Sequence, residues 1–555
     1  MSTEPVDDAT VDDNTVQTWI DADPDPVSRA ELAALDADEI AERFSDTLHF
    51  GTAGLRGPVR AGPNGMNVAV VTRTTHAIAD WLERGAEAGA TVVVGRDARH
   101  GSEAFAAATT GVLAARGFDV VALPDPAPTP LVAFACRDLG ASLGIQITAS
   151  HNPPADNGYK VYVSGGAQLI PPDDAEIEAL IATAPAAADI PRVDVVPDDR
   201  ARRNTDRYLA RLAHRFGTVE SATSIRIALT AMHGVGGRLA SEALRQAGFD
   251  DLHVVDQQFE PDPDFPTVQF PNPEEPGAAD LLLGLAADIN ADLAIALDPD
   301  ADRCAVGIRD TAGWRMLTGD ETGALFAAHL LEANAASATA LIAPVVASTI
   351  VSGSLAGRIA ESAGARSVRT LTGFKWLVRA GEPLLYAYEE AIGHCVDPDA
   401  VRDKDGISAA VVAAQLAHRR KSAGSDLRGA LDDLQATFGV HVTAQRSVRV
   451  TDLAEITMIM RGLRADPPQR LCDIEIRADD QSARTDHLAT DAVIMSGTAA
   501  DGTTIRVVAR PSGTEPKLKY YVEAVALPDT GELGDVRTRL GSLVASILDE
   551  LPGAT

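Results

Sequence analysis

One succession of segments occurs three times along this chain: an apolar strand, a polar loop, an alanine-rich helix that ends near a glycine, and a second strand. Two of the predicted helices are followed by the same Gly-Phe-Asp triplet. Shared spacing predicts related structural units, and alternating strands and helices predict mostly parallel sheets with right-handed crossovers. The copies are residues 92–97, 103–115 and 117–121; residues 225–230, 238–246 and 248–255; and residues 340–346, 355–363 and 367–368.

The pattern changes beyond about residue 440, where β-rich runs at 440–450 and 504–508 flank a helical stretch at 452–463. A chain of 555 residues is also too long for one hydrophobic core. We therefore predict an α/β fold class, with three related α/β domains of mixed or parallel sheets and a smaller C-terminal α+β domain. The expected parts are an acidic, helical segment at residues 1–45 and domains at residues 46–220, 221–318, 319–440 and 441–555.

Composition excludes several classes of function. The formal net charge of −32 argues against a nucleic-acid partner, because a surface that neutralises phosphates has to be basic. No apolar run approaches the ~20 residues of a membrane span, and the first residues lack the regions of a signal peptide. Four widely spaced cysteines favour reduced thiols and a cytoplasmic protein. Six lysines stand against 42 arginines, so each lysine is informative.

The most informative loop follows an apolar run at residues 141–147. It contains Ser150, His151 and Asn152 in succession, then two prolines and, further on, Lys160. A buried strand that leads into a polar loop brings reactive groups to the edge of the sheet where open α/β sheets bind ligands. Turn chemistry explains the asparagines, prolines and glycine, but it does not explain the Ser-His pair or the lysine. Polar residues on a loop held by a rigid scaffold indicate function.

A second loop carries three alternating carboxylates, Asp298, Asp300 and Asp302, directly after a predicted strand at 293–297. Oxygen ligands of this kind suit Mg²⁺. The same spacing opens an EF-hand calcium loop, which requires glycine at its sixth position and glutamate at its twelfth. Those positions hold Arg303 and Arg309, so a calcium loop is excluded. A solvated acidic turn is the simpler alternative.

A third loop, near the C-terminus, combines a guanidinium, two hydroxyls, an ammonium group and a flexible glycine backbone. These groups suit a phosphate dianion held by fork-like and backbone N–H contacts. The chain contains no Gly-x4-Gly-Lys-Ser/Thr, so the loop is not a nucleotide P-loop. Its residues are Arg510, Ser512, Gly513, Thr514 and Lys517.

Two further groups are candidates for binding. Glu389 and Glu390 end a predicted strand at 384–388, where adjacent carboxylates can accept hydrogen bonds from neighbouring sugar hydroxyls. Gly373 and Lys375 lie in the preceding loop. Three arginines are candidate anion contacts near the serine, although an exposed surface position is the commoner explanation for the last two: Arg56, Arg96 and Arg99.

Taken in order, these motifs resemble those of the α-D-phosphohexomutases, the phosphoglucomutase and phosphomannomutase superfamily. The resemblance covers nearly the whole chain and is weakest in the first 45 residues. It implies four domains around a central cleft, and it identifies Ser150 as the carrier of the phosphoryl group. The other roles that it implies are as follows: Ser150, Asp298, Asp300 and Asp302 as ligands of one Mg²⁺; Lys160, His151 and Arg56 as catalytic groups; and Arg303 (beside the phosphoserine), Gly373, Lys375, Glu389, Glu390, Arg510, Ser512, Gly513, Thr514 and Lys517 as substrate-binding residues.

The implied reaction moves a phosphoryl group between the 1- and 6-positions of a hexose phosphate, glucose and/or mannose. It passes through a phosphoserine enzyme and a hexose 1,6-bisphosphate, which is both intermediate and activator. Lys160 would exchange a proton if the metal and nearby arginines depress its pKa, with His151 in support. The implied partners are small-molecule sugar phosphates, with neither nucleic acid nor membrane, for a monomer or dimer.

One departure leaves an alternative open. The Glu-Glu-Ala-Ile-Gly sequence at 389–393 differs from the Gly-Glu-Met-Ser-Gly of many bacterial members. Together with the glycine-rich residues 51–57, it looks more like the phosphoglucomutase-2/phosphopentomutase branch, so a phosphopentomutase is the alternative function. A phosphatase would leave the Ser-His-Asn-Pro loop unexplained. A non-catalytic sugar-phosphate binding protein would need only the phosphate and glutamate loops.

Overall fold

The structure is a computed structural model that describes residues 12–51, 54–85, 89–219, 224–336, 342–450, 452–512, 517–528 and 530–553. The chain forms two compact units, and each is described by itself. The first unit comprises Met1–Ser221, Arg226–Cys304 and Asp397–Val411. The second comprises Ala222–Ile225, Ala305–Val396 and Val412–Thr555.

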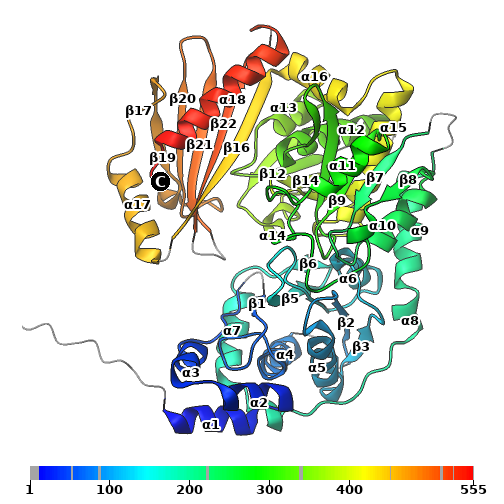
Figure 1. Cartoon of the computed structure of the whole chain (residues 1–555), viewed down its shortest axis with the longest axis vertical. Coiled ribbons are helices and arrows are strands. Elements are labelled where there is room, and N and C mark those ends of the chain that lie inside the picture. The colour runs from blue at the N-terminus through cyan, green and yellow to red at the C-terminus, as the bar shows by residue number, and fades with distance from the viewer. Residues whose placement is uncertain are drawn as a thin grey trace, which may run out of the picture. The chain divides into compact units, whose positions relative to one another are not determined.

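The first unit begins with three short helices that lie beside the first α/β domain (Figure 1). Each helix has an aspartate N-cap whose side chain accepts a hydrogen bond from a backbone N–H of the first turn. Aspartate is a favoured N-cap residue, so part of the acidic composition of this segment serves to start helices. The helices are α1 (Asp13–Ala22), α2 (Pro26–Ala34) and α3 (Ala37–Phe44).

The first α/β domain contains a mixed sheet in the order β1-β5-β4-β2-β3, with β6 paired to β5. Strand β2 runs parallel to β3 and β4, and β5 runs antiparallel to β4 and β1. Every side chain of β4 is buried, as the sequence LGIQI predicts for a central strand. The strands are β1 (Leu55–Pro58), β2 (Thr91–Arg96), β3 (Asp119–Ala122), β4 (Leu143–Ile147), β5 (Asp156–Val163) and β6 (Ala167–Gln168); the helices are α4 (Val68–Glu83), α5 (Ser102–Ala115), α6 (Thr129–Asp138) and α7 (Asp173–Thr183).

A second parallel group of strands completes the first unit. Strand β7 pairs in parallel with both β8 and β9, and β9 is buried along its whole length. The strands are β7 (Ile227–Thr230), β8 (Leu252–Val254) and β9 (Leu293–Leu297); the helices are α8 (Asp199–Arg202), α9 (Asn204–Phe216), α10 (Gly237–Gln246) and α11 (Asp280–Asp288).

The second unit contains a hairpin and a four-stranded sheet in the order β13-β12-β14-β15. Strand β12 runs parallel to β13 and β14, so their carboxyl ends share one edge of the sheet. The strands are β10 (Cys304–Asp310), β11 (Gly313–Met316), β12 (Val345–Thr349), β13 (Arg366–Thr370), β14 (Leu384–Glu389) and β15 (Gly393–Cys395); the helices are α12 (Gly319–Ala336), α13 (Leu355–Ser362), α14 (Phe374–Leu377), α15 (Gly406–Ser422) and α16 (Leu427–Phe438). Cys304 of β10 and the residues of α15 up to Val411 belong to the first unit.

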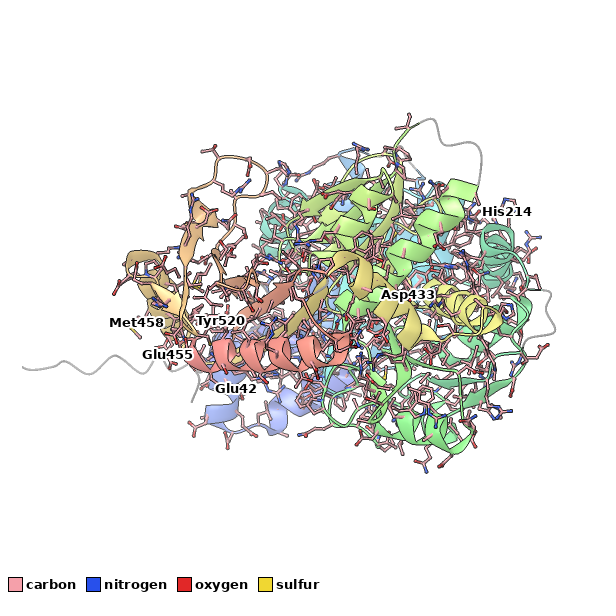
Figure 2. All side chains as sticks on the ribbon, turned by 90° about the horizontal axis from the view of Figure 1, so that it is seen from above. Glu42, His214, Asp433, Glu455, Met458 and Tyr520 are labelled. Carbon is pink, nitrogen blue, oxygen red and sulfur yellow. The ribbon has the colours of Figure 1, made fainter. Side chains whose placement is uncertain are left out.

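The C-terminal part of this unit is an antiparallel sheet in the order β16-β22-β21-β20-β19, with α18 lying along its β16–β22 side (Figure 1). Its core includes Tyr520, and Figure 2 shows Glu455 and Met458 on α17 at the outer edge of the same domain. The strands are β16 (Val440–Arg449), β17 (Arg470–Leu471), β18 (Ile474–Glu475), β19 (Arg477–Asp480), β20 (Val493–Thr498), β21 (Thr504–Pro511) and β22 (Lys517–Ala526); the helices are α17 (Leu453–Ala465) and α18 (Leu533–Glu550).

The predicted fold class is confirmed, and the three predicted repeats form β2-α5-β3, β7-α10-β8 and β12-α13-β13. One boundary is wrong. The strand expected at 340–346 begins only at Val345, after Pro344, which has no N–H to donate to a neighbouring strand; residues 340 and 341 lie outside the described residues. None of the described helices is long and apolar enough to cross a bilayer.

Candidate active site

The serine loop follows the buried strand β4, the aspartate loop follows the buried strand β9, and the two loops are in contact within the first unit. The Ser150 hydroxyl donates a hydrogen bond of 2.9 Å to Asp298 Oδ2, and its oxygen lies 3.3 Å from His151 Nδ1. Ser150 is 2% exposed and has a φ of 53°, an uncommon backbone conformation for a residue with a side chain. Its N–H donates to Thr148 Oγ1, which helps to hold this turn. The serine is therefore fixed against a carboxylate that is 148 residues distant in sequence.

The three aspartates are fully buried, and they offer oxygen atoms that all lie within 4.8 Å of one another. Burial, reinforced by Asp300 and Asp302, raises the pKa of Asp298 well above its usual value. Asp300 Oδ1 and Asp302 Oδ1 have no hydrogen-bond partner among the described residues. Buried carboxylates need compensation, and hard oxygen ligands at this spacing fit a divalent cation such as Mg²⁺.

Lys160, on β5, is in contact with two of these aspartates. Its Nζ donates 2.6 Å hydrogen bonds to Asp300 Oδ2 and Asp302 Oδ2. Burial alone lowers the pKa of Lys160, but the two carboxylates outweigh burial and raise the pKa above its usual value. The depressed pKa that proton exchange by Lys160 requires is therefore absent from this arrangement, and it would need a cation to take the place of the lysine at the carboxylates.

A second buried lysine, Lys404, was missed by the sequence analysis. Its Nζ lies 3.4 Å from Asp302 Oδ2 and 3.5 Å from Asp403 Oδ1. Burial alone raises the pKa of Asp302, but Lys160 and then Lys404 lower it far below the usual range. The rarity of lysine was a usable signal for Lys404, as was the run of charged residues at 402–405.

Arg99 lies in the interior of the first unit. The expectation of an exposed surface position is wrong, because Arg99 is 4% exposed. Its guanidinium donates to the carbonyl oxygens of Ser150 and Asn152, both at 2.6 Å, and to those of Pro153 (2.8 Å) and Asp156 (3.1 Å). Arg99 therefore holds the serine loop by its backbone, and it does so without using a surface contact.

Arg56, His151 and Arg303 complete this cluster. Arg56 donates a 2.8 Å hydrogen bond to Asn152 Oδ1. Arg303 Nε lies 3.9 Å from Asp298 Oδ2 and 3.8 Å from Asp302 Oδ1. Burial, together with Arg303 and Arg56, lowers the pKa of His151 well below its usual value. His151 is therefore a neutral imidazole near neutral pH, beside the serine oxygen.

The second unit holds the glutamate loop. Glu390 Oε2 accepts hydrogen bonds of 2.9 Å from both Thr349 Oγ1 and Ser352 Oγ, at the carboxyl end of β12. Glu389 is the last residue of β14, and both glutamates are half-buried. In the preceding loop, Gly373 has a φ of 105°, which favours glycine, and Lys375 Nζ lies 5.7 Å from the centre of the Trp376 ring.

The predicted phosphate loop connects two antiparallel strands of the C-terminal sheet. Arg510 lies near the end of β21, and Lys517 begins β22. The N–H of Ser512 donates to the carbonyl oxygen of Lys517 at 2.8 Å, which closes the base of the loop. Gly513 and Thr514 lie outside the described residues.

Comparison with known proteins gives matches over most of the chain. Four family models match, described as phosphoglucomutase/phosphomannomutase alpha/beta/alpha domains I, II and III and the C-terminal domain, over residues 47–187, 206–312, 318–434 and 448–535. A protein named probable phosphomannomutase from Haemophilus influenzae is 40% identical over 471 residues, which cover 83% of this chain and 93% of that protein.

Two further matches cover more of the chain. A protein named phosphopentomutase from Mus musculus is 34% identical over 591 aligned residues, covering 97% of this chain and 94% of that protein. The crystal structure of a putative phosphomannomutase from Thermus thermophilus has a TM-score of 0.68 and 23% identity, covering 91% of this chain and 98% of that one. At that identity the structural match supports the fold alone.

Proposed function

The chain belongs to the phosphoglucomutase/phosphomannomutase family, and we propose that it moves a phosphoryl group between the 1- and 6-positions of a hexose phosphate, glucose and/or mannose. The family places it among the phosphomutases, with a sugar phosphate as substrate. One observation carries the proposed chemistry: the Ser150 hydroxyl is hydrogen-bonded to one of three buried, converging carboxylates.

The first half of the proposed reaction starts from Ser150 in its phosphorylated form. The bond between Ser150 Oγ and phosphorus breaks, and a bond forms between phosphorus and the oxygen of a sugar hydroxyl. Transfer of this kind depends mainly on positioning and on stabilising the charge of the phosphoryl oxygens. Arg99 fixes the backbone of the serine loop, and the Arg56 and Arg303 guanidiniums lie within the same cluster.

The acidic loop fits a magnesium site. Asp298, Asp300 and Asp302 would hold the ion, with Ser150 or its phosphate as a further oxygen ligand. A bound Mg²⁺ stabilises negative charge on the transferring phosphoryl group. Lys160 already places a cation against two of the carboxylates, which supports a site built for positive charge.

A proton must leave the attacking sugar hydroxyl. His151 is a candidate acceptor because its imidazole is neutral and its Nδ1 lies 3.3 Å from the serine oxygen. Lys160 is the other candidate, but only in a state that has released its carboxylate partners, because these partners raise its pKa.

The second half of the reaction returns the other phosphate of the hexose 1,6-bisphosphate to Ser150 after the sugar has turned. An anchor for the non-reacting phosphate is then required, and we assign this role to Arg510, Ser512 and Lys517, with Gly513 and Thr514. Glu389 and Glu390 would accept hydrogen bonds from the sugar hydroxyls, assisted by Gly373 and Lys375.

A phosphopentomutase is the second candidate. The Glu-Glu-Ala-Ile-Gly sequence at 389–393 favours it, as does the 34% identity to the mouse protein of that name over 97% of this chain. The same serine and aspartate chemistry serves either sugar, because only the acceptor hydroxyl differs.

The test is turnover of glucose 1-phosphate, mannose 1-phosphate and ribose 1-phosphate, each with Mg²⁺ and the matching bisphosphate. We expect conversion of at least one hexose phosphate, its loss with a chelator, and its loss in Ser150→Ala. Conversion of ribose 1-phosphate alone would replace the hexose proposal by the pentose one. Conversion of none of the three sugars would contradict the mutase proposal.

A further inference from the structure

A cavity of about 660 Å³ lies within the second unit, where the loop after β12 meets strands β20 and β21. Its volume is in the range that holds a drug-sized ligand. The described residues that line it include four arginines: Arg358, Arg369, Arg484 and Arg506. This concentration of positive charge is unexpected in a chain with a formal net charge of −32.

The positive charges of this cavity are only partly balanced. Glu523 is the one carboxylate among the described lining residues, and its Oε2 lies 3.5 Å from Arg506 Nε. Its other oxygen accepts hydrogen bonds from the N–H and hydroxyl of Ser354, at 2.6 and 2.7 Å. Arg358 and Arg369 have no carboxylate within ion-pair distance among the described residues. Arg506 is thus paired with Glu523, and Arg358 and Arg369 are the two arginines of the cavity that lack a carboxylate partner among the described residues.

Two of the arginines are held rigidly. Arg506 donates to the carbonyl oxygens of Ile350 (2.6 Å) and Ser352 (2.5 Å). Arg369 donates to those of Thr349 (3.0 Å) and Ser352 (2.8 Å). Burial, and then the neighbouring Arg369, lower the pKa of Arg506. Two cations that repel each other in a largely buried place are stabilised by an anion between or beside them.

The other two arginines retain free donors. The only hydrogen bond of Arg358 among the described residues is a long one, at 3.4 Å, to the carbonyl oxygen of Phe438. Arg484 pairs with Asp486, which does not line the cavity, and its side chain is 35% exposed. Hydroxyls from Ser496 and Thr498 add donors to the same wall. Guanidinium forks and hydroxyls are the groups that bind phosphate best.

This cavity is separate from the predicted phosphate loop. Arg506 and Arg510 lie on the same face of β21, four residues or roughly 13 Å apart. Val508 lies between them and is buried in an apolar cluster with Ile350, Val351 and Tyr521. An anion bound at Arg506 therefore cannot be the phosphate that Arg510 would hold.

We propose that this cavity is a second anion-binding site, built for a small phosphorylated molecule that carries more than one negative charge. Arg369 and Arg506, which are held by backbone carbonyls, supply positive charge at fixed positions. Arg358 and Arg484 donate hydrogen bonds to the ligand from their remaining N–H groups. The site goes beyond the proposed mutase chemistry, because none of its arginines belongs to the serine, aspartate, glutamate or phosphate loops.

The probe for the test is inorganic pyrophosphate, titrated calorimetrically in a magnesium-free buffer with a chelator. The protein carries Arg510→Ala, which weakens the predicted phosphate loop. We expect this protein to bind pyrophosphate, and the further pair Arg358→Gln and Arg484→Gln to weaken that binding at least tenfold, or about 1.4 kcal/mol. Arg369 and Arg506 are left intact because they hold backbone carbonyls.

The matched control is the pair Arg461→Gln and Arg477→Gln, which removes the same charge from exposed positions of the same unit outside the cavity. We expect this pair to change the affinity less than twofold. Failure of the Arg510→Ala protein to bind pyrophosphate would overturn the proposal, and so would equal weakening by the two pairs. If the double variant unfolds, Arg484→Gln alone is used, and an unchanged affinity then overturns the proposal.

Mutase turnover without added pyrophosphate separates this proposal from the proposed function. Replacing Arg358 and Arg484 in the otherwise unaltered chain should leave turnover within twofold. A loss of pyrophosphate binding together with intact turnover supports a second site. Equal loss of both would mean that the cavity belongs to the catalytic machinery, and it would overturn the inference of a separate site.

Discussion

Arg99 should control the geometry of the serine loop without touching the substrate. Its guanidinium satisfies four carbonyl oxygens between Ser150 and Asp156, and its side chain is 1% exposed. Arg99→Met keeps an apolar stem of similar length and removes all four donors. A buried carbonyl that loses its partner costs about 1–3 kcal/mol. Four carbonyls at the low end of this range give about 4 kcal/mol. The buried Asp97 carboxylate, 3.5 Å from Arg99 Nε, also loses its cation, which adds to this cost.

The loop is expected to relax, so most of the effect should appear in catalysis. Displacing a reacting atom by about 1 Å costs on the order of 100-fold in rate. We therefore expect Arg99→Met to lower kcat about 100-fold and to lower the free energy of unfolding by about 4 kcal/mol or more. Arg99→Lys should recover little, because one ammonium cannot span four carbonyls.

The assay is steady-state mutase turnover together with denaturant unfolding, and Arg96→Gln is the control. Arg96 lies on the preceding strand and is half-buried, and its one side-chain hydrogen bond within the described part of the chain, at 3.4 Å, is to the carbonyl oxygen of Asp97. The control should stay within threefold of the parent. Parental kcat and stability in Arg99→Met would refute the positioning role. An equal loss in the Arg96 control would do the same.

Three further predictions concern the carboxylates Asp300, Glu390 and Asp320. Asp300→Asn removes one charge from the carboxylate cluster, so activity should require a higher Mg²⁺ concentration; an unchanged magnesium dependence would contradict the metal assignment. Glu390→Gln should lower turnover and alter the ratio of hexose to pentose phosphate use, and a variant equal to the parent on every sugar would place specificity elsewhere. Burial raises the pKa of Asp320 to about 6, so the folded state binds more protons than the unfolded state between about pH 4 and 6, and stability from this group falls as pH rises through that window. The free energy of unfolding of Asp320→Asn should be compared with that of the parent at pH 4 and at pH 7. The difference in favour of the variant should grow by up to about 3 kcal/mol between these two pH values. A difference that does not vary with pH would contradict the raised pKa of Asp320.

Local sequence predicted the elements on which the candidate site is built. An apolar run followed by Ser150, and another followed by Asp298, both proved to be buried strands that end at polar loops. Strands of this kind have strong and unambiguous patterns. The ends of elements were less predictable, because Pro344 delays β12 although the apolar run begins before it.

Contacts between distant segments could not be predicted in the same way. Arg99 looks like a surface residue because its burial depends on the serine loop, which lies about fifty residues further along the chain. Lys404 contacts Asp302 only through the folding of residues 397–411 into the first unit. The raised pKa of Lys160 depends on two carboxylates about 140 residues away. No local sequence pattern predicts contacts between residues that lie so far apart in the chain, although the rarity of lysine indicated which residues to examine.

The most direct test of the proposed mechanism is transfer of label from a sugar phosphate to the protein. The chain is incubated with glucose 1-phosphate carrying radiolabelled phosphate, with Mg²⁺ and bisphosphate, and the labelled peptide is identified by mass spectrometry. The account predicts a single labelled site at Ser150, with no label in Ser150→Ala or in the presence of a chelator. Label on another residue, or label that persists in Ser150→Ala, would contradict the assignment of Ser150 as the phosphoryl carrier.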